Sequence, residues 1–128
     1  MACNILIVDD SATTRAMIKR VIRMSGVPVD QTLEAPDGKV AMGLLAQHPI
    51  DIVLADLHMP EMTGLELTRA MQANPATSPI PIVIISAEPN TATIEALEKE
   101  GIRGHLRKPF TPEALRTCLT DLLGVIHG

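Results

Sequence analysis

Short, continuous apolar runs, each followed by a segment with helical spacing, are the feature that most constrains how this chain can fold. Strong runs lie at residues 4–8, 50–55 and 81–85, and more polar ones lie at 29–35 and 103–107. A strand that is apolar on both faces is typical of a parallel sheet covered by helices on both sides. The alternating pattern predicts an α/β fold of five βα units, with the polar runs near the edges of the sheet.

Apolar residues recur at helical spacing between these runs. Ser11 can cap the first helix, and Gly26 and Pro28 end it. Further helices are expected at about 65–73 and at 91–100. The predicted buried stripes of the first, second and last helices are Thr14, Met17, Ile18, Val21 and Ile22; Val40, Ala41, Leu44 and Leu45; and Leu115, Cys118, Leu119, Leu122, Leu123 and Ile126. Right-handed crossovers then give a three-layer sandwich. The flavodoxin-like strand order 2-1-3-4-5 is taken by analogy with known doubly wound sheets.

Polar side chains stand where four of the apolar runs stop. Asp9 and Asp10 follow the first, Asp56 the third, Ser86 the fourth and Lys108 the fifth. In a parallel sheet these positions share one rim, which is where open α/β sheets bind ligands. Three carboxylates, a hydroxyl and an ammonium predict a site for a hard divalent cation and a phosphoryl group.

Composition excludes several classes of function. The chain has 128 residues, which suits one domain, and its net charge of −4 argues against a nucleic-acid partner. No apolar run is long enough to span a membrane, and the amino terminus does not resemble a secretion signal, so we expect a cytoplasmic protein. Cys3 and Cys118 lack metal-type spacing and are expected to be reduced thiols. Phe110 is the single aromatic residue, so the core is expected to be aliphatic, with most methionines serving as packing.

The chain resembles a response-regulator receiver domain, specifically a stand-alone, chemotaxis-type (CheY-like) regulator, along essentially its whole length. The segments that carry the resemblance are Val8-Asp9-Asp10-Ser11, Asp56 with His58-Met59-Pro60 and Gly64, Ser86-Ala87, and Lys108-Pro109-Phe110. The resemblance implies a single receiver domain over residues 1–128 with no output domain. It also implies a monomer or weak dimer that acts in two-component signalling.

The resemblance assigns chemistry to the strand-end residues. Asp56 would accept a phosphoryl group from a phosphohistidine of a histidine kinase. Mg²⁺ would be held by Asp10 and Asp56, by Asp9 directly or through water, and by the backbone carbonyl of His58. Because transfer adds negative charge to the site, Lys108 and Ser86 are the expected donors to the new phosphoryl oxygens.

The resemblance also assigns switching and tuning roles. The Ser86 hydroxyl would move towards the phosphoryl group, and the ring at position 105 would swing inward. Here that residue is His105, where Tyr or Phe is more usual, so the switch is expected to differ. His58 and Glu88 would tune hydrolysis of the acyl phosphate. The resemblance implies a cis Lys108–Pro109 bond, although the residues alone leave the isomer open.

Each of these residues has an ordinary structural interpretation when taken alone. Acidic residues at strand ends are often solvated groups or helix caps, and His105 on an edge strand can be simple surface. Together they favour a phosphoacceptor switch that assists its own phosphorylation and dephosphorylation without being an enzyme in the usual sense. Its downstream target would be a motor switch or a phosphotransferase. The alternatives are a phosphorelay intermediate, a phosphorylation-independent interaction module and, more distantly, a Mg²⁺-dependent phosphohydrolase.

Overall fold

The computed structural model of the chain describes residues 2–59, 62–87 and 91–124. Strands and helices alternate strictly along the chain, as the apolar pattern predicts. The strands are β1 (Cys3–Val8), β2 (Val29–Ala35), β3 (Ile52–Asp56), β4 (Ile82–Ser86) and β5 (Gly104–Arg107). The helices are α1 (Ala12–Ser25), α2 (Gly38–Gln47), α3 (Gly64–Ala73), α4 (Thr91–Glu100) and α5 (Pro112–Leu123).

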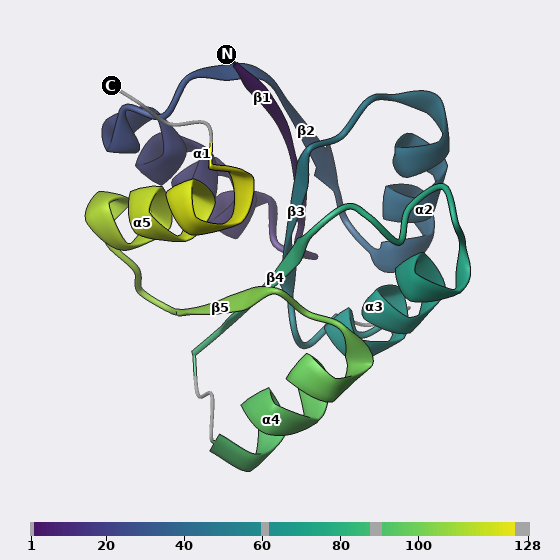
Figure 1. The fold of residues 1–128 in the computed structure, drawn as a ribbon. Coiled ribbons are helices and arrows are strands. Elements are labelled where there is room, and N and C mark those ends of the chain that lie inside the picture. The colour runs from purple at the N-terminus through teal and green to yellow at the C-terminus, as the bar shows by residue number, and fades with distance from the viewer. Residues whose placement is uncertain (1, 60–61, 88–90, 125–128) are drawn as a thin grey trace.

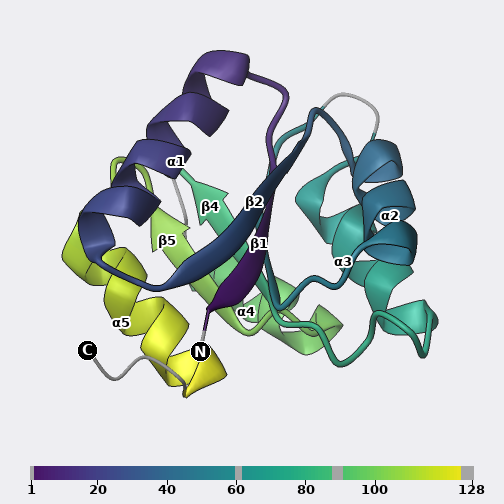
Figure 2. The ribbon, with the colours of Figure 1, turned by 90° about the horizontal axis from the view of Figure 1, so that it is seen from above.

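The strands form one parallel sheet in the order β2-β1-β3-β4-β5, which confirms the doubly wound, flavodoxin-like arrangement. Figure 1 shows α1 and α5 on one face of this sheet and α2, α3 and α4 on the other. Figure 2, turned by 90°, shows the same three layers from above. The polar strands β2 and β5 lie at the two edges, as their composition predicts.

The core consists of two aliphatic clusters, one on each face of the sheet. The cluster under α1 and α5 includes Ile5, Ile18 and Leu115, and the cluster under α2, α3 and α4 includes Leu6, Leu67 and Leu97. Successive residues of β1 therefore point to opposite faces and are buried on both. This double burial explains why the central strands are continuously apolar.

Several predicted element boundaries shift by one or two residues. Strand β3 begins at Ile52 rather than residue 50 and includes Asp56, and β4 includes Ser86. The two polar side chains therefore belong to the last residues of hydrogen-bonded strands, which fixes their positions more firmly than a loop would. Ile126, expected on the last helix, lies outside the described residues.

Two predicted core positions are wrong. Met17 and Val40 are each 42% exposed. Helix α1 buries the narrow stripe that contains Ile18 and Ile22, and Met17 falls one residue outside it. Because apolar atoms cover much of any folded surface, spacing alone does not separate the rim of a buried stripe from its centre.

Candidate functional site

The candidate site lies at the carboxyl ends of the central strands. Asp9 follows β1, while Asp56 and Ser86 end β3 and β4. Asp56 is in register with Ile85, so Ser86 lies one residue beyond its level on the neighbouring strand. Parallel pairing thus brings these residues to one rim, as the sequence predicts.

Asp9 is the most completely held residue of the site. It is 2% exposed, and its backbone N–H donates to the Ala35 carbonyl at 3.0 Å. The Ser11 N–H donates to Oδ1 at 2.9 Å, and the Lys108 ammonium donates to Oδ2 at 3.2 Å. The Arg15 guanidinium donates to the Asp9 carbonyl oxygen at 2.6 Å. Every polar atom of Asp9 therefore has a protein partner.

Asp56 lies in a different electrostatic setting from Asp9. Its side chain is 14% exposed, and Lys108 Nζ is 3.6 Å from Oδ1. Burial raises the pKa of the Asp56 carboxyl, and the charges of Asp9 and Asp10 raise it further, against the lowering effects of Lys108 and a backbone hydrogen bond from His58. The site therefore holds more negative charge than a single ammonium offsets.

The three carboxylates can serve as one cation site. Asp9, Asp10 and Asp56 each offer an oxygen, and these oxygens lie within 4.8 Å of one another. Asp10 is exposed to solvent, so a partly hydrated ion can reach it. Carboxylate oxygens with room for water suit Mg²⁺, which keeps several waters when it binds proteins. The donor set therefore fits the predicted metal.

Gly64, the first residue of α3, lies close to the backbone of Asp56 and Leu57 at the end of β3. A Cβ at Gly64 would stand 2.8 Å from the Asp56 carbonyl oxygen and 3.0 Å from Leu57 Cα. The Gly64 N–H donates to the Leu57 carbonyl at 2.9 Å. A capping box of Thr63 and Glu66 fixes the start of the helix at this point. Gly64 thus lets α3 begin directly against the backbone of Asp56.

The structure places the remaining predicted residues as follows. Ser86 is 4% exposed, and its carbonyl accepts a hydrogen bond from the Lys108 N–H at 2.9 Å. The end of β4 is therefore bonded to the residue that follows β5. The Lys108–Pro109 peptide is cis, as the resemblance implies. His58 and His105 are exposed, and His105 lies on the edge strand β5 in register with Ile84, two residues before Ser86 on β4. Glu88 lies outside the described residues.

Sequence reasoning missed the role of Arg15, because helical spacing places this residue outside the apolar stripe of α1. Its side chain is 16% exposed, and it joins the Asp9 carbonyl to Glu34 on β2. A basic residue in the first turn of a helix that follows an acidic pair is only a weak indication that the two are in contact. The signal becomes informative when the register of β1 and β2 is known.

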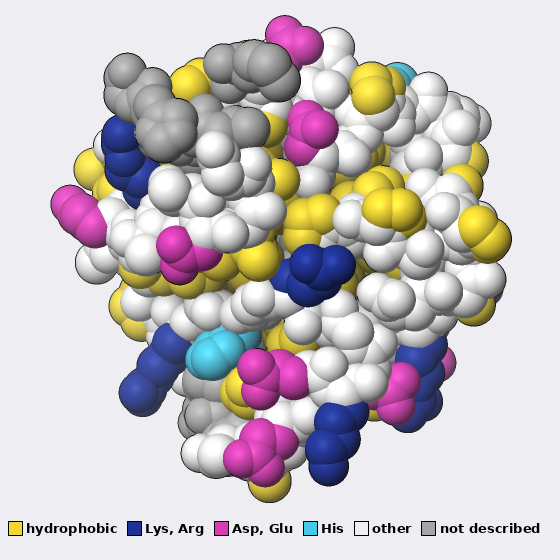
Figure 3. Space-filling view, viewed as in Figure 1, with side chains coloured by type: hydrophobic (Ala, Val, Ile, Leu, Met, Phe, Trp, Pro, Cys, Tyr) yellow, Lys and Arg dark blue, Asp and Glu magenta, His cyan; other side chains and the backbone are white. Residues whose placement is uncertain are grey.

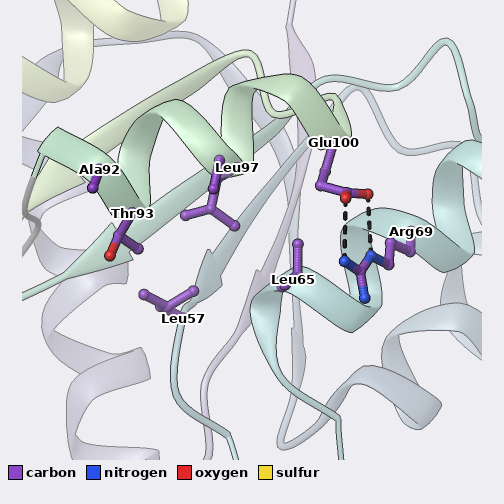
Figure 4. A pocket seen from close by; sticks show the side chains of 8 residues that line it. Leu57, Leu65, Arg69, Ala92, Thr93, Leu97 and Glu100 are labelled. Atoms are coloured by element: carbon purple, nitrogen blue, oxygen red, sulfur yellow. Dashed lines mark hydrogen bonds and ion pairs between the residues drawn. The ribbon is translucent and has the colours of Figure 1, made fainter.

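A hollow of about 340 Å³ lies between α3 and α4, next to the loop after Asp56. Figure 4 shows Leu57, the residue after Asp56, lying opposite Leu97 and Thr93 of α4. At the other end, Arg69 Nε is 3.1 Å from Glu100 Oε2 and links the two helices. Because Leu97 is the buried side chain of α4, this helix is lightly anchored beside the loop that follows Asp56.

Known proteins share both the sequence pattern and the fold. The family model of the response regulator receiver domain matches residues 5–120, and the chain belongs to this family. A chemotaxis protein CheY homolog from Campylobacter jejuni is 36% identical over 98% of this chain and 95% of its own length. The chemotaxis protein CheY of Pseudomonas aeruginosa is 34% identical over 98% of this chain and 99% of its own. The structure of Vibrio cholerae chemotaxis protein CheY4 has a TM-score of 0.83 at 29% identity and covers 95% of this chain and 99% of its own.

One face of the molecule carries charged side chains of both signs. The face in Figure 3 carries acidic and basic side chains interspersed, rather than one continuous basic patch. Among the described residues, no helix is both long and apolar enough to cross a membrane.

Proposed function

We propose that this chain is a phosphoacceptor switch of the chemotaxis type, with Asp56 as the residue that is phosphorylated. The observation that carries the proposal is the setting of Asp56, whose side chain is 14% exposed and lies between the Asp9–Asp10 pair and Lys108. A carboxylate in this setting has a charge partner for the incoming group, and it is shielded from bulk water. The CheY-named relatives support a role in chemotaxis.

In the proposed reaction, an Asp56 carboxylate oxygen forms a bond to phosphorus while the bond from phosphorus to the histidine nitrogen of the donor breaks. Phosphoryl transfer depends mainly on positioning and on offsetting charge. Lys108 lies 3.6 Å from Asp56 Oδ1 and 3.2 Å from Asp9 Oδ2, so it is placed to neutralise charge on either side of the acceptor. Ser86, buried at the end of the neighbouring strand, is the proposed hydroxyl donor to the phosphoryl oxygens.

A bound Mg²⁺ would supply positive charge that lets three carboxylates and a phosphoryl donor come together. Asp10 and Asp56 are the proposed direct ligands, with the backbone carbonyl of His58. Asp9 is proposed to act through water, because the Ser11 N–H and Lys108 already bind its two carboxylate oxygens. This assignment narrows the sequence-based expectation, which left direct ligation by Asp9 open.

The proposed partners are a histidine kinase and a protein target that binds the surface of α4, β5 and α5. The α3–α4 hollow supports the inclusion of α4, since Leu57 places the acceptor loop in its lining. We further propose that residues 1–128 act as a single receiver domain in the cytoplasm, as a monomer or weak dimer. The protein would assist its own phosphorylation and dephosphorylation, with His58 and Glu88 tuning the latter.

The decisive experiment is labelling with acetyl phosphate and Mg²⁺, followed by intact-mass measurement. The wild type should gain the mass of one phosphoryl group, and Asp56→Asn should gain none, because the amide cannot act as the acceptor. Asp121→Asn, the same change at an exposed position on α5, should label like the wild type. Undiminished labelling of Asp56→Asn would remove Asp56 from the role, and a wild type that never labels would favour the interaction-module alternative.

A further inference from the structure

The backbone of the turn that carries the acidic pair is tied to both neighbouring elements. Asp9 donates to Ala35 at the end of β2, and the Ser11 N–H turns back onto the Asp9 carboxylate. One polar atom of this turn is bound from α1. Arg15 Nη1 donates to the Asp9 carbonyl oxygen at 2.6 Å, across one turn of the helix. Since Asp10 is the next residue, the orientation of this peptide sets where its carboxylate can point.

Arg15 is itself held by a second element. Its Nε lies 3.1 Å from Glu34 Oε1, and Lys19 Nζ lies 3.1 Å from Glu34 Oε2. Lys19 and Arg15 hold the pKa of the Glu34 carboxyl below its ordinary value, so Glu34 is ionised near neutral pH. Glu34 pairs with Ile7 in the register of β1 and β2, two residues before Asp9. Strand β2, helix α1 and the acidic turn are therefore connected through one guanidinium.

We propose that Arg15, held in place by Glu34, is a positioning residue that fixes the Asp9–Asp10 turn in the conformation that binds Mg²⁺. This inference rests on the proposed function of the site, and it adds residues that do not touch the ion or the phosphoryl group. Partners that orient metal ligands from outside the coordination shell commonly change metal affinity by about 10- to 100-fold when removed. The Arg15–Glu34 pair is such a partner, because it binds the peptide that joins Asp9 to Asp10.

The contacts require an arginine in particular. Nε and Nη1 of one planar guanidinium donate in different directions, to Glu34 and to the Asp9 carbonyl. A lysine at this position has a single nitrogen and can keep one of the two contacts at full strength. The exposed fraction of the Arg15 side chain is 16%, so its contacts are better shielded from solvent than those of a fully exposed arginine.

The test compares Mg²⁺ affinity, measured by titration calorimetry with the metal alone, in Arg15→Met and Arg20→Met. Both variants remove one arginine from α1, but Arg20 is exposed and serves as the matched control. Arg15→Met should raise the Mg²⁺ dissociation constant about tenfold. Arg20→Met should change it by less than about twofold, the effect of one distant, screened charge. Equal affinities for the two variants would overturn the proposal.

A second readout separates positioning from general stability. With acetyl phosphate as donor, Arg15→Met should label slowly at limiting Mg²⁺ and approach the wild-type rate at saturating Mg²⁺. A rate that is reduced by the same factor at every Mg²⁺ concentration would mean a structural role and would refute positioning. Arg15→Lys should lie between the wild type and Arg15→Met in Mg²⁺ affinity.

Glu34→Gln keeps the test decisive if Arg15→Met does not fold. This variant retains Arg15 but weakens its anchor, and it should raise the Mg²⁺ dissociation constant by less than the about tenfold increase expected for loss of the arginine itself. An unchanged constant in Glu34→Gln would remove Glu34 from the proposal. Failure of the proposed function has a different signature, because the wild type itself would then neither bind Mg²⁺ nor become labelled.

Discussion

Replacing Gly64 by alanine should destabilise the protein through the backbone that carries Asp56. The added Cβ would lie 2.8 Å from the Asp56 carbonyl oxygen, 2.9 Å from Ile84 Cδ1 and 3.0 Å from Leu57 Cα. The contacts with Asp56 and Leu57 involve backbone atoms, which cannot rotate away as a side-chain end can. Extra volume forced into a packed site costs about 1–3 kcal/mol.

Gly43 provides a matched control, because it is a helical glycine at which an added Cβ meets no clash. It lies within α2, and a Cβ there would meet nothing within 4 Å. Alanine in an exposed helix interior is favoured over glycine by about 0.5–1 kcal/mol. Gly43→Ala should therefore stabilise the protein by about that amount, while Gly64→Ala should destabilise it by about 1–2 kcal/mol after the same helix preference is subtracted.

Urea unfolding with linear extrapolation measures both changes, and the two variants should differ by about 2 kcal/mol in free energy of unfolding. Gly64→Ala should also slow labelling of Asp56 by acetyl phosphate, because relief of the clash moves the acceptor loop. Gly43→Ala should label normally. A Gly64→Ala variant as stable as Gly43→Ala would refute the claim that close packing at this position places Asp56.

Two further predictions concern charge and switching. The pKa of Asp56 is raised in the folded protein, so the folded state binds the proton of this carboxyl more tightly than the unfolded state does. The free energy of unfolding of the wild type therefore falls as pH rises through that raised pKa. In Mg²⁺-free buffer Asp56→Asn should therefore become more stable than the wild type as pH rises from acid to neutral, and equal pH profiles in thermal unfolding would contradict this. His105→Ala should weaken binding of the phosphorylated protein to its target at least several-fold while leaving Asp56 labelling intact. Arg103→Ala, at another exposed position next to β5, is the control, and equal target binding by the two variants would make His105 a bystander.

The identity of the central strands and the location of the site could be predicted because both depend on simple features of the chain, whereas the full strand order was taken by analogy with known doubly wound sheets. Strands that are buried on both faces must be apolar at every position, so β1, β3 and β4 are recognisable as central strands. Polar residues that interrupt such a run mark its carboxyl end. In a parallel sheet all of these ends lie on one rim, so sequence positions 9, 56 and 108 are predicted to be neighbours without knowledge of side-chain packing.

Features that depend on the exact register or rotation of an element could not be predicted. The pairing of Arg15 with Glu34 joins α1 to β2, and it requires the register that sets Ile7 against Glu34. The exposure of Met17 and Val40 depends on how far each helix is rotated over the sheet. Residue spacing defines a helical face to within about one residue, which is too coarse to decide either case.

The three carboxylates of the site are held to different degrees, and this difference bears on how the site works. Asp9 has a protein partner at every polar atom, so the protein itself fixes its position. Asp10 is exposed, and the pKa of Asp56 is raised by burial and by its acidic neighbours. The charge on Asp56, one of the residues proposed to bind Mg²⁺, therefore destabilises the ligand-free folded state. Binding of a cation would offset this charge and raise the free energy of unfolding. The affinity for the cation should also depend on how rigidly Asp9 holds the turn that carries Asp10.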